Sequence, residues 1–129
     1  METQQDLVDA IRALAMTANP YSQIVSGSTP PINGICMIQA PSSPASIFKN
    51  KGMLKEMSIL INAKNADQSL VYSTLCEIHK VLTKTWNYPN SGEFQVIDIE
   101  TEAEPNLLGR EENNQWIYGS SVLVKYFWR

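Results

Sequence analysis

Residues 115–127, QWIYGSSVLVKYF, form the stretch that decides the fold of this chain. Its side chains follow the two-residue repeat of a β-strand, in which neighbours point to opposite faces. One face carries Trp116, Tyr118, Val122, Val124, Tyr126 and, just beyond the stretch, Trp128, while the other carries Ile117, Leu123 and Phe127. A strand that is apolar on both faces is usually central in its sheet or covered by a partner. The stretch therefore predicts a long strand of this kind.

Shorter strand patterns precede this stretch. Phe94–Thr101 and Pro105–Glu111 are predicted as two further strands, and a turn at residues 112–114 follows them. The last third of the chain is thus expected to form a three-stranded antiparallel meander. Earlier strands are expected in three apolar segments, Ile35–Gln39, Ala45–Phe48 and Met53–Ala63.

Two segments have the spacing of amphipathic helices. The first runs from about Asp6 to Ala18 and is ended by Asn19-Pro20, because proline disfavours the helical conformation of the residue before it. The second begins at Asp67, whose carboxylate is a good N-cap, and ends before a loop at residues 87–92. Its apolar residues form a helical stripe of Val71, Leu75, Ile78 and Leu82.

These elements predict an α+β fold. We expect one domain over residues 1–129, with a mixed, largely antiparallel β-sheet covered on one face by the two helices. The apolar stripe of the second helix should be buried against Ile59 and Ile61 of the sheet.

Composition excludes several classes of protein. The chain has 43% hydrophobic and 18% charged residues, as globular proteins do, and its net charge of −3 gives no electrostatic reason to bind nucleic acid. No apolar run approaches the roughly 20 residues that span a bilayer, so no membrane partner is expected. The first residues, Met1–Asp6, are acidic and polar, unlike a signal peptide. We therefore expect synthesis in a cytoplasm-like compartment, where Cys36 and Cys76 would be buried, reduced thiols.

Few residues could carry chemistry. His79 is the only histidine and lies on the flank of the helical stripe, where a hydrogen-bonded boundary residue is expected. Its i, i+3 spacing from Cys76 could supply two zinc ligands or a nucleophilic pair, but no further ligands or orienting carboxylate accompany it. Carboxylates that alternate along one predicted strand indicate a solvated face rather than acid–base catalysis: Asp98, Glu100, Glu102 and Glu104. We predict no catalytic residue, no metal site and no cofactor.

The chain also carries residues typical of interfaces. Three consecutive aromatic residues and an arginine stand at positions 126–129, and these types are enriched in interface hot spots. A polar, proline-bounded loop at residues 41–52 is a second candidate, because loops often carry binding residues. The predicted interface residues are Ile47, Phe48, Lys49, Lys51, Tyr126, Phe127, Trp128 and Arg129.

In its order of elements, the chain resembles the minor capsid and tail-terminator proteins of long-tailed phages. Two parts carry the resemblance. One is the strand, P-x-x-P turn, short strand and glycine of Ile35–Gly52, followed by Ser58–Lys64, and the other is the closing strand Trp116–Tyr126. Related proteins often have an arginine after the third strand, where this chain has Asn62-Ala63-Lys64.

The resemblance implies a structural virion protein without enzymatic activity, located where tail and head meet and made in the host cytoplasm. It implies a ring, expected to be a hexamer, that caps the finished tail tube, stops its polymerisation and offers a surface for joining the head. The partners would be other copies of the chain, the tail-tube protein and a head-completion protein, while DNA passes through the lumen without specific binding. Two alternatives remain open: a head-completion or neck adaptor protein of the same particle, and a small α/β enzyme.

Overall fold

The computed structural model of the chain describes residues 4–27, 33–40, 46–47, 53–84, 88 and 94–128. Two helices and six strands follow one another in the order α1 (Gln4–Met16), β1 (Ile24–Ser26), β2 (Ile35–Ala40), β3 (Ser46–Ile47), β4 (Met53–Asn65), α2 (Gln68–Lys84), β5 (Phe94–Arg110) and β6 (Trp116–Trp128). Among the described residues, no helix has the length and apolar character needed to cross a membrane.

The strands form one mixed sheet, which confirms the predicted α+β class. Its order is β1-β2-β4-β6-β5, and β3 pairs with the first residues of β4. The β1–β2 pair is parallel and the other pairs are antiparallel. The long strand β6 lies between β4 and β5, in a continuous register from Met53↔Trp128 to Asn65↔Trp116 on its β4 side. Its apolar character on both faces is therefore that of a central strand, as predicted.

The predicted three-stranded meander is wrong, because the segments Phe94–Thr101 and Pro105–Glu111 belong to a single strand. β5 runs from Phe94 to Arg110 and pairs with β6 along its length, with four shifts of register. Such β-bulges absorb extra residues without ending a strand. Pro105 is compatible with the strand because β5 is at the edge of the sheet, where a missing N–H need not pair.

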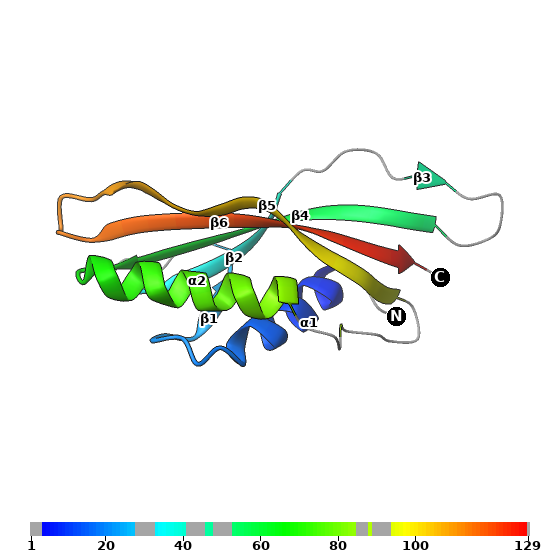
Figure 1. Cartoon of the computed structure of the whole chain (residues 1–129), viewed down its shortest axis with the longest axis horizontal. Helices are drawn as coiled ribbons and strands as arrows, with labels where there is room; N and C mark the ends of the chain where they lie inside the picture. The colour runs from blue at the N-terminus through cyan, green and yellow to red at the C-terminus, as the bar shows by residue number, and fades with distance from the viewer. Residues whose placement is uncertain are drawn as a thin grey trace.

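Both helices lie on the same face of the sheet, as predicted (Figure 1). The stripe of α2 and the facing residues of β4 are completely buried: Val71, Leu75, Ile78, Leu82, Ile59 and Ile61. The Asp67 carboxylate caps α2 by accepting a hydrogen bond from the Leu70 amide at 3.2 Å. α1 ends at Met16, two residues earlier than predicted, and the turn that follows closes at Asn19, whose φ is 54°.

Sequence analysis placed no strand at β1, and its short length explains why. Ile24–Ser26 has only three residues, too few for an alternating pattern to be recognised. The strand pairs with Ile35–Met37 of β2 and buries Ile24 completely. β1 therefore extends the sheet at the edge opposite to β5.

Candidate assembly surface

The face of the sheet turned away from the helices has no covering element among the residues that the structure describes (Figure 1). On β4 the buried residues Met57, Ile59 and Ile61 face the helices, so Ser58 and Leu60 lie on the opposite side. We call this opposite side the outer face. Its apolar part is an aliphatic stripe across three strands, in which Ile38 pairs with Leu60, and Leu123 pairs with Ser58. Leu60 is 37% exposed, so the stripe is open to a partner.

Charged side chains lie beside the aliphatic stripe. The Lys125 ammonium contacts a carboxylate oxygen of Glu100 at 2.9 Å, and Glu102 accepts a hydrogen bond from the Ser58 hydroxyl at 2.9 Å. The hydrogen bond from Lys125 holds the pKa of Glu100 below its ordinary value. The Glu102 side chain spans β6 to reach β4, because β6 separates their two strands. The hydrogen bond to Glu100 and the charges of Glu100, Glu56 and Asp98 raise the pKa of Lys125, so acidic side chains predominate around this ammonium.

A close contact over Gly119 completes the outer face. A Cβ atom at Gly119 would lie 2.7 Å from Cδ1 of Leu108 and 2.8 Å from the side-chain oxygen of Asn62. The side-chain amide of Asn106 donates a hydrogen bond to the Gly119 carbonyl at 3.1 Å, which holds the far part of β5 against β6. The ends of the Leu108 and Asn62 side chains therefore lie in the space that a side chain at position 119 would occupy, and a larger residue there would have to displace them. Leu108 itself remains 57% exposed beside the aliphatic stripe.

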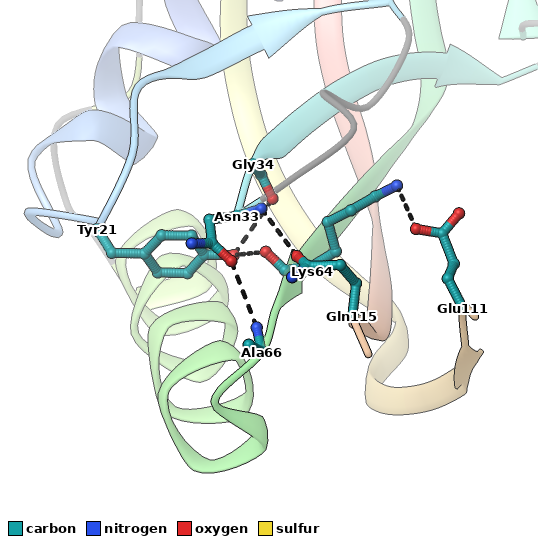
Figure 2. Close-up of polar contacts among 7 residues, drawn as sticks. All are labelled: Tyr21, Asn33, Gly34, Lys64, Ala66, Glu111 and Gln115. Atoms are coloured by element: carbon teal, nitrogen blue, oxygen red, sulfur yellow. Dashed lines mark hydrogen bonds and ion pairs between the residues drawn. The ribbon is translucent and has the colours of Figure 1, made fainter. Parts of the chain in front are cut away.

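Polar contacts fix one end of the sheet, as Figure 2 shows. The Tyr21 hydroxyl lies 2.7 Å from the Lys64 carbonyl and 3.2 Å from the Gly34 carbonyl, and the Lys64 amide donates to the same Gly34 carbonyl at 2.9 Å. Burial raises the pKa of Tyr21 to about 12, against the smaller opposite effect of the Lys64 hydrogen bond. The hydroxyl therefore stays protonated at neutral pH and joins β2 to β4 as a donor.

The turn between β5 and β6 is tied to the same end of the sheet (Figure 2). The Lys64 ammonium contacts a carboxylate oxygen of Glu111 at 2.7 Å, and the Gln115 side chain accepts a hydrogen bond from the Asn33 amide at 2.8 Å. Asn33 in turn accepts from the Ala66 amide at 3.3 Å. Lys64 supplies the cation of this ion pair. The β5–β6 turn is thus held in one orientation.

The predicted interface residues fall into four groups. Tyr126 is 1% exposed on the helix-covered face, so it belongs to the core and its side chain is not available to a partner, in contrast to the prediction. Phe127 is half-buried on the outer face. Ile47 pairs with Met53, which pairs with Trp128, so the backbone brings two predicted segments to the same end of the sheet. The remaining four lie outside the described residues: Phe48, Lys49, Lys51 and Arg129.

A hollow of about 240 Å³ lies between α2 and β5, where sequence analysis had considered a catalytic pair. The Nε2 atom of His79 lies 2.8 Å from the Thr101 hydroxyl, and its Nδ1 atom is buried with no hydrogen-bond partner among the residues that the structure describes. Cys76 also lines the hollow and is only half-buried, whereas Cys36 is fully buried, as predicted. Within the described ranges, no group of three or more His, Cys, Asp or Glu residues is placed to hold a metal ion.

The environment of His79 makes stability depend on pH. Burial lowers the pKa of His79, against the smaller opposite effect of Glu104. The unfolded chain, in which histidine titrates near about 6.5, then binds a proton more readily than the folded chain. This contribution to stability is complete above that pH and is lost as the pH falls through the folded pKa. We expect the unfolding free energy of the wild type, minus that of His79→Gln, to decrease between pH 7.5 and 5.5. An equal difference at the two pH values would contradict a lowered pKa.

Comparisons with known proteins show a shared fold. No family model matches the chain, and no curated protein sequence matches it. Among solved structures, it is similar to a chain of the "Virion of native gene transfer agent (GTA) particle", with a TM-score of 0.58 and 12% sequence identity. The alignment covers 95% of this chain and 90% of the other. The two proteins therefore have the same overall fold over nearly their whole lengths.

Proposed function

We propose that this protein is a structural component of a phage-like virion and acts as its tail terminator. Copies of the chain form a ring, expected to be a hexamer, on the end of the finished tail tube. The ring stops polymerisation of the tube and presents a surface to the head-completion protein, and DNA passes through its lumen without specific binding. The isolated chain is monomeric or weakly associated and closes into a ring at the tube end.

The observation that carries this proposal is the fold match to a chain of a gene transfer agent virion. The match spans 95% of this chain and 90% of the other, so it concerns the architecture as a whole and not one shared motif. The outer face adds a second argument, because an exposed aliphatic stripe on an uncovered sheet suits a subunit that is buried in an assembly. A role without catalysis follows from the same reasoning, since an assembly protein acts through surfaces.

A head-completion or neck adaptor protein of the same kind of particle is the second candidate, because the fold match to a virion chain does not distinguish between the components of such a particle. The two roles differ in the defect that loss of the protein causes. Without a terminator, tail tubes grow beyond their normal length. Without a head-completion protein, tails keep their normal length but stay unattached.

Electron microscopy of particles assembled with and without this protein tests the proposal. We expect over-long, uncapped tubes in its absence and tubes of uniform length when purified protein is added back. Measured tube lengths that are uniform in both samples would contradict the terminator role. Uniform, unattached tails would instead support the adaptor role.

A further inference from the structure

The described part of α2 presents a basic surface opposite to the outer face. Lys80 and Lys84 are exposed one helical turn apart and point away from the buried stripe, since they lie about half a turn from Ile78 and Leu82. Together with Glu77 and Val81 they line a shallow hollow of about 300 Å³. The ion pairs within the described residues involve neither lysine. We call Lys80, Val81 and Lys84 the basic face.

The outer face has the complementary charge. Glu100 and Glu102 are exposed on β5 beside the aliphatic stripe, and Lys125 offsets only one of these carboxylates. Residues two positions apart on a strand and residues four positions apart on a helix are separated by similar distances, roughly 6 Å in each case. Two lysines of a helix can therefore face two glutamates of a strand, with Val81 directed to the stripe around Leu60.

Edge pairing between copies is disfavoured by the same strand. β5 forms one edge of the sheet, and its four register shifts, its proline and its alternating carboxylates are features that block strand addition. Copies of the chain are therefore not expected to pair along the β5 edge, and we consider contacts between the faces of the sheet and the helices instead. Because the helices and the outer face lie on opposite sides of the sheet, a contact between the two surfaces joins copies head to tail (Figure 1). Head-to-tail contacts form a ring when the rotation closes.

We propose that copies of this chain associate by docking the basic face of one copy on the outer face of the next, with Lys80 and Lys84 opposite Glu100 and Glu102. This inference rests on the proposed ring-forming function and names the two surfaces of the subunit contact. Exposed ion pairs contribute little individually and are screened by salt, so the contact is weak in solution. Several such contacts closing one ring on a tube end make it stable.

Charge reversal tests the contact. We expect sedimentation velocity at low ionic strength to detect concentration-dependent association of the wild type, weaker at high salt. Lys80→Glu/Lys84→Glu and Glu100→Lys/Glu102→Lys should each self-associate at least about tenfold more weakly than the wild type. A mixture of these two variants should associate again, because each restores the opposite charges that the other lacks. Thermal unfolding of each variant checks that it is folded.

A matched variant controls for overall charge. Asp6→Lys/Glu112→Lys has the same net charge as Glu100→Lys/Glu102→Lys, but its changes lie on α1 and on the β5–β6 turn. It should self-associate like the wild type. In a mixture with Lys80→Glu/Lys84→Glu it should dock its intact basic face on the unchanged outer face of that variant, which cannot pass the contact on to a further copy. A wild type that stays monomeric at every concentration, reversals without effect, or a mixture that stays monomeric would each overturn the proposed contact. If the reversal variants still limit tube length, the contact is wrong while the terminator role stands.

Discussion

Replacing Tyr126 by alanine is expected to lower the free energy of unfolding by about 3–5 kcal/mol, as for other large buried aromatic residues. Tyr126 is 1% exposed and is one of the largest fully buried side chains. Its backbone pairs with Lys55 of β4 and Val96 of β5, so the cavity would open under the helix-covered face, near one end of the central strand. Urea denaturation of the two proteins at pH 7 measures the difference.

Phe127 is the matched control, because it is the next residue of the same strand and faces the opposite side of the sheet. It is half-buried on the outer face, so Phe127→Ala should cost less than half of the Tyr126→Ala loss. Equal losses for the two variants would mean that both rings lie in the core, and the outer face would then be covered at this end.

Leu75→Ala is expected to cost about 2–5 kcal/mol, because the residue is completely buried between α2 and the sheet. Leu70→Ala removes the same atoms from the same helix at a position that is 38% exposed, and should cost under about 1 kcal/mol. Chemical denaturation of the two variants gives the comparison directly. A loss below about 0.5 kcal/mol for Leu75→Ala would show that the stripe of α2 does not pack on the sheet.

The parts of the fold that the sequence predicts well are those with a long, regular repeat. Each of two patterns extends over several periods: the stripe from Val71 to Leu82 and the alternation from Trp116 to Trp128. Only a helix brings the first set of apolar residues to one side, and only a strand does so for the second. Alternation also separates Tyr126 from Phe127. It does not say which of the two faces the helices cover, and this explains why Tyr126 was assigned to the interface.

The remaining features depend on contacts between distant segments. The continuity of β5 through Pro105 requires a neighbouring strand that tolerates bulges, and no local pattern reports this. The ion pair of Lys64 with Glu111 joins residues of two different strands, and the contact of Leu108 over Gly119 depends on the bulges between them. The residues of the outer face depend on which side of each strand the helices cover, and the pattern of a single strand does not report this. The two lysines of the basic face are visible in the sequence as cations one helical turn apart. Their position opposite the outer face depends on how α2 packs on the sheet.

The central place of β6 has a consequence for biosynthesis. β4 emerges from the ribosome well before β6, and α2 and β5 are made between them, yet both β4 and β5 must wait for β6 before they have their principal neighbour. The pairing of β4 with β6 is long-range and folds slowly, whereas β5 and β6 form a local hairpin. A nascent chain that stops before β6 exposes two long strands without a common partner and has no complete outer face. If copies associate through the outer face, as proposed, we expect incomplete translation products to be excluded from the assembly.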